Sequence, residues 1–306
     1  MTTALTATGL TQLYPGGGGI RDVNLTVADQ SVTAVIGPNG AGKTVLFSIL
    51  VGLVTPQSGT VNFASSNPRV AYCPDVPQFE PWLTAFEVVQ TSMAVAQRNA
   101  MRCSLPNTSD PVGCALQTCG LDRVMHRRIA GFSRGMLQRL GIAAGLVTDP
   151  DVLVLDEPNS ALDPIGRADV REVIMEQKRH RCILLSSHLL SEVEKLADHI
   201  IVINHGRMVA SGTTPSILAK GMKPVWTLRL ASPTAIDARR FAATLPDVSL
   251  RCTSDTMCTL GFSSFEAAQT QLVPALAELH APILEVSLRD QDLDVSFARI
   301  LGEEER

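Results

Sequence analysis

Short apolar runs alternate with longer helix-forming segments along the first two thirds of the chain. Runs rich in β-branched residues, typical of strands, lie at residues 31–36, 151–155, 182–186 and 199–203. Helix-forming segments separate these runs. Because strands that alternate with helices form parallel sheets covered by helices, residues 1–220 are predicted to form an α/β domain.

Between residues 84 and 124 the strand-like runs disappear and helix formers dominate, with a turn-rich break at 106–111. We interpret this segment as a helical insertion, and expect a helical subdomain over about residues 84–148. Four consecutive glycines at residues 16–19 stand between two strand-like segments. No helix or lysine follows them directly, so we expect a flexible hairpin loop and not a phosphate-binding loop.

A different organisation follows the turn residues at 221–224. Strands are predicted at 225–230, 248–252, 257–261 and 283–288, and helices at 233–245 and 264–280. The order β-α-β-β-α-β is that of a small ferredoxin-like α+β domain, which we place at residues 225–306, with a last helix at 292–301.

Composition narrows the class of protein. Among the 306 residues, 45% are hydrophobic and 18% are charged, which excludes a disordered chain. The net charge is -4, without a basic stripe, so no nucleic-acid partner is expected. No apolar run reaches the length of a membrane span and no signal peptide precedes the first strand. The seven scattered cysteines predict reduced thiols in the cytosol.

The strongest motif lies between the predicted strand 31–36 and a predicted helix at 44–50. It matches G-x-x-x-x-G-K-[ST] and comprises Gly37, Pro38, Asn39, Gly40, Ala41, Gly42, Lys43 and Thr44. Glycines let consecutive backbone N–H groups point at phosphate oxygens, and the helix N-terminus adds partial positive charge. Lys43 would reach the terminal phosphates and Thr44 would ligate Mg²⁺. The motif predicts a nucleoside triphosphate site.

Two carboxylates follow the apolar run at 152–155. Asp156 and Glu157 would emerge at the carboxyl end of a buried strand, where open α/β sheets place their ligands. Asp156 is predicted to hold Mg²⁺, and Glu157 to polarise the attacking water as general base. Further along, Ser133 and Gly135 stand before a helical stretch at 136–147, which predicts a second anion site at a helix N-terminus.

Taken in this order, the motifs of residues 5–220 resemble the nucleotide-binding subunit of an ABC transporter. The segment 133–139 resembles the family signature, and Met136, at the fifth position of that five-residue signature, resembles the branch of ABC-2 type exporters. The resemblance implies further nucleotide-site residues, namely Tyr14 stacking on adenine, Val45 after the P-loop threonine, Ser133, Gly135 and Met136 in the signature, Asp163 in the D-loop, and His188 as the switch histidine.

Two positions depart from the family pattern. Asp75 stands where the family has a Gln or Glu that contacts Mg²⁺ and senses the membrane partner, so it is a candidate catalytic residue and metal ligand. Gln78 would replace it only if the loop were displaced. Arg134 replaces the first signature glycine. Both departures bear more on the rate of hydrolysis than on nucleotide binding.

The resemblance implies an ATPase that uses ATP and Mg²⁺ and works as a homodimer or heterodimer, since one chain carries one P-loop and one signature. Separate transmembrane permease subunits would complete an exporter, with this chain cytoplasmic, on the inner face of the cell membrane. Residues 78–91, including Trp82 and Phe86, are the predicted docking surface. Two alternatives stay open: a non-transport ABC ATPase acting on ribosomes or DNA, and a weakly hydrolysing nucleotide sensor.

Overall fold

The computed structural model describes residues 2–99, 110–160, 162–231, 241, 243–245, 247–289 and 293–304. The chain divides into two compact units, Met1–Thr214 and Pro215–Arg306. No helix within these described ranges is long and apolar enough to cross a membrane.

The first unit is built on a sheet whose six strands are predominantly parallel, as the alternation of strands and helices predicted. Its order is β5 (Val70–Cys73), β6 (Val152–Leu155), β7 (Cys182–Ser186), β3 (Val32–Ile36), β8 (His199–Asn204) and β9 (Arg207–Thr213). Only β9 runs antiparallel to its neighbour within this described sheet. Every residue of β3, β6 and β7 is buried, which explains why their sequences are almost entirely apolar.

An antiparallel sheet and a helix cover one face of the central sheet. The strands are β1 (Thr3–Leu13), β2 (Gly19–Ala28) and β4 (Ser58–Phe63), and the helix is α1 (Lys43–Leu50). Their apolar side chains form one core cluster with those of β3, β6, β7 and β8. The glycine run closes the β1–β2 hairpin, where the Tyr14 N–H donates to Gly18 O at 3.0 Å. The hairpin prediction is confirmed.

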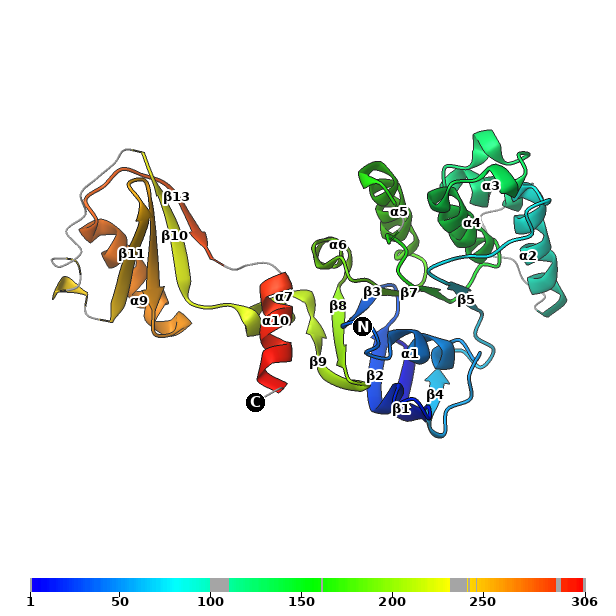
Figure 1. The fold of residues 1–306 in the computed structure, drawn as a ribbon, viewed down its shortest axis with the longest axis horizontal. Helices are drawn as coiled ribbons and strands as arrows, with labels where there is room; N and C mark the ends of the chain where they lie inside the picture. Colours follow the sequence, from blue (N-terminus) through cyan, green and yellow to red (C-terminus); the bar gives the residue numbers. More distant parts are fainter. Residues whose placement is uncertain are drawn as a thin grey trace. The chain divides into compact units, whose positions relative to one another are not determined.

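The helical insertion lies beside the edge strand β5 (Figure 1). It comprises α2 (Ala85–Asn99), α3 (Pro111–Thr118), two single 3₁₀ turns (Asp122–Val124 and Ile129–Gly131) and α4 (Arg134–Leu146). Helices α5 (Pro164–Gln177) and α6 (Leu190–Leu196) connect the later strands. Most of the predicted break at 106–111 lies outside the described residues, which resume at Asp110. The Asp110 side chain caps α3 by accepting from the Gly113 N–H at 2.8 Å.

The second unit contains a four-stranded antiparallel sheet in the order β11 (Val248–Ser254), β12 (Met257–Phe262), β10 (Val225–Leu230) and β13 (Ile283–Leu288). This order agrees with the predicted ferredoxin-like module. Helix α9 (Phe265–Glu278) packs on the sheet through Ala268 and Ala275. Helices α7 (Thr214–Gly221) and α10 (Leu293–Glu304) are joined by the Ser296 hydroxyl, which donates to Leu218 O. The predicted helix at 233–245 falls largely outside the described residues.

The expectation that all thiols are reduced is wrong for one pair. Cys252 and Cys258 form a disulfide between β11 and β12. Strand register sets these two residues directly opposite each other, with their Cα atoms 3.9 Å apart. The five residues between Cys252 and Cys258 in the sequence do not by themselves indicate that the two cysteines are paired. Among the described residues, the cysteines at positions 73, 114, 119 and 182 are free thiols.

Candidate functional site

The phosphate-binding loop connects β3 to α1 and depends on its glycines. Gly40 and Gly42 have φ of 78° and 105°, in the region that favours glycine. A Cβ on Gly42 would lie 2.7 Å from the Gly19 carbonyl oxygen, so the β2 strand also excludes a side chain there. The β8–β9 turn supports the loop, because the Gly206 N–H donates to Ala41 O at 3.0 Å. Gly42 provides no side-chain cap, which leaves the first N–H groups of α1 available to an anion.

Lys43 is folded into this loop. Its side chain is buried, and Nζ donates to Gly37 O at 2.7 Å and to Pro38 O at 3.1 Å. Burial lowers the pKa of Lys43, while the nearby Glu157 and Asp156 carboxylates raise it. Because both hydrogen-bond partners of Lys43 Nζ are backbone carbonyl oxygens, phosphate oxygens can replace them.

Asp156 is the centre of a hydrogen-bonded cluster at the carboxyl end of β6. Its Oδ2 accepts from the Thr44 hydroxyl at 3.0 Å and from the Tyr72 hydroxyl at 3.3 Å. Its Oδ1 accepts from the Ser186 hydroxyl at 2.5 Å. Burial and Asp156 raise the pKa of Tyr72, which keeps this phenol a proton donor. Thr44 and Asp156 thus offer adjacent oxygen ligands of the type that Mg²⁺ prefers.

Glu157 and His188 form a hydrogen-bonded pair beside the Asp156 cluster. Glu157 has φ of 49°, and its N–H donates to the Ser186 hydroxyl at 2.8 Å. The His188 Nδ1 lies 2.7 Å from Glu157 Oε2, and the His188 backbone N–H donates to the same oxygen at 3.2 Å. The structure thus brings together four residues predicted from distant segments: Thr44, Asp156, Glu157 and His188.

One residue of the signature and one of the D-loop cap the helices that follow them. The Ser133 hydroxyl caps α4 by accepting from the Met136 N–H at 3.2 Å. The Asp163 carboxylate caps α5 by accepting from the Gly166 N–H at 2.8 Å. Gly135 faces the D-loop, since a Cβ there would lie 2.8 Å from Leu162 Cδ2. Nucleotide contacts by these residues stay predictions.

The two departures from the family pattern lie together. Asp75 Oδ1 accepts from the Ser160 hydroxyl and lies 3.8 Å from Arg134 Nη2. Asp75 therefore joins the signature loop to the D-loop, whereas the carboxylate beside Thr44 belongs to Asp156. The role of Asp75 as a metal ligand stays a prediction.

Two residues at the nucleotide site have simpler surroundings. Tyr14 is 43% exposed at the end of β1, so its ring is accessible to a ligand. Val45 on α1 packs against the main core cluster. Stacking of Tyr14 on a base stays a prediction.

Sequence reasoning missed Tyr72 and Ser186, both of which contact Asp156. Ser186 does carry a signal, since it is a polar residue at the carboxyl end of a wholly buried strand. Tyr72 lies three residues before Asp75, and the sequence around it gives no sign that its partner is on β6. Only the pairing of β5 with β6 brings the two residues together.

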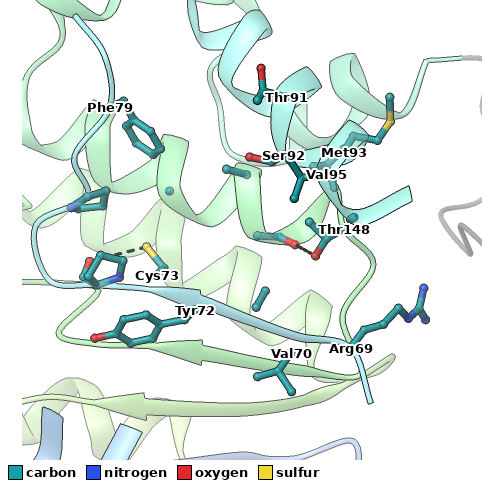
Figure 2. A pocket seen from close by; sticks show the side chains of 18 of the residues that line it. Arg69, Val70, Tyr72, Cys73, Phe79, Thr91, Ser92, Met93, Val95 and Thr148 are labelled. Atoms are coloured by element: carbon teal, nitrogen blue, oxygen red, sulfur yellow. Dashed lines mark hydrogen bonds between the residues drawn. The ribbon is translucent and has the colours of Figure 1, made fainter. Parts of the chain in front are cut away.

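A cavity of about 610 Å³ lies beside this site, between β5, α2 and α4. Figure 2 shows Ser92 and Val95 from α2 on one wall and Cys73 from β5 on another. Gln78 and Phe79, from the segment after Asp75, also line it. Exposed apolar side chains nearby include Val95 in its wall, with 57% exposure, and Trp82 on the loop between Phe79 and α2, with 64%.

Comparison with known proteins identifies relatives of this chain. A family model described as ABC transporter matches residues 20–160. An ABC transporter ATP-binding protein of Bacillus subtilis, YxlF, is 34% identical over 68% of this chain and 70% of its own length. The bacitracin transport ATP-binding protein BcrA of Bacillus licheniformis is 34% identical, over 68% of this chain and 69% of its own. The daunorubicin/doxorubicin resistance ATP-binding protein DrrA of Streptomyces peucetius is 30% identical, over 98% of this chain and 93% of its own length.

Solved structures agree with these relatives. The ATP-binding subunit of an ABC transporter is 27% identical to this chain, with a TM-score of 0.61 over 71% of this chain and 92% of its own. The ADP conformation of the ATP-binding cassette MJ1267 is 22% identical, with a TM-score of 0.60 over 72% and 96%. The similarity to MJ1267 supports the fold assigned to Met1–Thr214.

Proposed function

The chain belongs to the ABC transporter family as an ATP-binding, ATP-hydrolysing protein, and we propose that it is the ATPase subunit of an ABC-2 type exporter. The observation that carries the proposal is the convergence of Thr44, Asp156, Glu157 and His188 beside the phosphate-binding loop. Relatives named for bacitracin transport and for daunorubicin/doxorubicin resistance support export over the two alternatives.

Nucleotide binding would use groups that are already in place. The N–H groups of the loop and of α1 would bind phosphate oxygens, and Lys43 would exchange its bonds to Gly37 O and Pro38 O for phosphate. Thr44 and Asp156 would hold Mg²⁺, which neutralises phosphate charge when it is bound. The predicted ligand Asp75 would contribute through water.

Hydrolysis needs a base and an orienting group. Glu157 would accept a proton from the attacking water. His188 holds Glu157 Oε2 through both its ring and its backbone N–H, which fixes the direction of the carboxylate. Since this sequence carries one P-loop and one signature, a second copy or a paralogue would supply the signature to each ATP.

The membrane partner would dock at the cavity between β5, α2 and α4. The cavity adjoins Cys73, two residues before Asp75, and the exposed side chains of Trp82 and Val95 provide apolar contacts nearby. Phe86 is less available, because its ring packs 5.6 Å from the ring of His126. Separate transmembrane permease subunits bound here would hold the chain at the cytoplasmic face of the cell membrane.

Substitution of the base tests the catalytic part. Glu157→Gln should lower the rate of Mg-ATP turnover about 100-fold or more. ATP binding should be retained, since only the proton acceptor is lost. Glu176→Gln, on the exposed surface of α5, is the matched control. Unchanged turnover in the Glu157 variant would show that the base is another group.

Photo-crosslinking tests the docking part. A benzophenone amino acid at position 82 should capture a membrane-spanning protein from detergent-solubilised membranes, identified by mass spectrometry. The same group at position 53 is the control, because Leu53 is 67% exposed, similar to the 64% of Trp82, and lies outside the predicted docking segment 78–91. Equal capture at both positions, or capture of non-membrane proteins alone, would contradict docking at this surface.

A further inference from the structure

Ser186 lies between the two acidic residues of the site. It is the last residue of β7 and is fully buried. Parallel pairing sets Leu155 opposite Leu185, so the residues that follow, Asp156 and Ser186, emerge side by side at the same edge of the sheet. The seryl side chain is therefore placed by the register of two central strands.

The direction of both hydrogen bonds of this hydroxyl is determined. The Glu157 backbone N–H can only donate, and it donates to Ser186 Oγ at 2.8 Å. The single hydroxyl hydrogen then remains for Asp156 Oδ1, which lies 2.5 Å away. Ser186 thus accepts from one acidic residue's backbone and donates to the other's carboxylate.

These two bonds separate the tasks of the two carboxylates. Because Oδ1 of Asp156 is held by Ser186, its Oδ2 faces Thr44, at 3.0 Å. Because the Glu157 N–H is held, the backbone keeps its positive φ of 49°. That conformation turns the Glu157 side chain toward His188, at 2.7 Å.

We propose that Ser186 is a positioning residue that orients Asp156 toward Mg²⁺ and Glu157 toward the attacking water. The inference rests on the proposed function and adds a group that touches neither nucleotide nor metal. Without the hydroxyl, Asp156 loses its partner on Oδ1 and is free to rotate away from Thr44. Metal affinity and turnover should then fall together.

The test compares two substitutions of equal shape. Ser186→Thr keeps a hydroxyl and Ser186→Val replaces it by a methyl group, so any crowding by the added carbon is common to both. Relative to the Thr variant, the Val variant should raise the Mg²⁺ concentration for half-maximal ATP turnover about fivefold and lower kcat about 30-fold, with the KM for ATP changed less than threefold, since loop contacts are untouched.

Ser187 provides the matched control. It is also buried, but its hydroxyl accepts from the Leu189 N–H at 3.0 Å and contacts neither acidic residue. Ser187→Ala should leave the Mg²⁺ dependence unchanged. Circular dichroism and ATP binding at saturating Mg²⁺ report whether each variant is folded.

Two results would overturn the assignment. One is the same Mg²⁺ dependence and kcat in the Thr and Val variants. The other is a Val variant with lower unfolding temperature but unaltered Mg²⁺ dependence, which would make Ser186 a structural residue only. If Glu157→Gln retains turnover while the Thr and Val variants still differ, the proposed base is wrong and the orientation of Asp156 stands.

Discussion

Asp75 and Arg134 both depart from the family pattern, and reverting them tests whether they act as a pair. The perturbations are Arg134→Gly, Asp75→Gln and the double variant, each of which restores the residue type expected from the family pattern. If the contact matters, each single reversion removes it, so the two effects on the rate of ATP turnover should not add in the double variant.

The size of the effect follows from the geometry of the pair. Arg134 Nη2 and Asp75 Oδ1 are 3.8 Å apart, and the two side chains are 57% and 42% exposed. Unscreened charges at this distance would attract by about 1 kcal/mol in water and about 4 kcal/mol at an effective dielectric constant near 20. Exposure places the pair near the lower limit, so we expect a coupling energy of about 0.5 kcal/mol, or roughly twofold in rate.

The assay is steady-state ATP turnover of the four proteins in a double-mutant cycle, at about 50 mM and about 500 mM salt. The coupling should be present at low salt and fall toward zero at high salt, because the screening length shortens to a few ångströms. A coupling that is zero at low salt would refute the pair as a functional contact. A drop of more than about tenfold for Asp75→Gln alone would instead indicate a direct role for Asp75 in catalysis.

Two further predictions concern stability. Asp149→Asn should lower the free energy of unfolding by about 3 kcal/mol in urea titrations, because Asp149 pairs with Arg69 at 3.0 Å and with the buried Arg181 at 3.5 Å; a loss below about 1 kcal/mol would contradict a role for this network. Reducing the Cys252–Cys258 disulfide should destabilise the second unit by about 2 kcal/mol, as expected for a short closed loop, and leave ATP turnover unchanged. Calorimetry with and without reductant measures the loss of stability caused by reducing the disulfide. A change in ATP turnover on reduction would contradict the expectation that the disulfide does not affect the nucleotide site.

Much of the fold follows from local patterns in the chain. The strands β3, β6 and β7 are buried throughout, so their sequences are mostly apolar and lack the alternation of apolar and polar residues typical of surface strands. The phosphate-binding loop is equally local, because its glycines, Lys43 and Thr44 are consecutive and their backbone conformation depends mainly on those residues. Asp156 and Glu157 were predicted for the same reason, since they terminate a buried run.

Contacts across strands and between loops were not predictable in this way. The hydroxyls of Tyr72 and Ser186 reach Asp156 from β5 and β7, and strand order, which no local pattern encodes, makes these three strands neighbours. Register across a hairpin likewise pairs Cys252 with Cys258.

Sequence therefore determined which chemical groups this protein carries and where the most buried strands lie, because these depend on neighbours a few residues away. The tertiary structure alone decided that Asp75 meets Arg134 and Ser160, and that a cavity opens between α2, α4 and β5. These contacts join residues far apart in the chain, and their geometry is set by how whole elements pack.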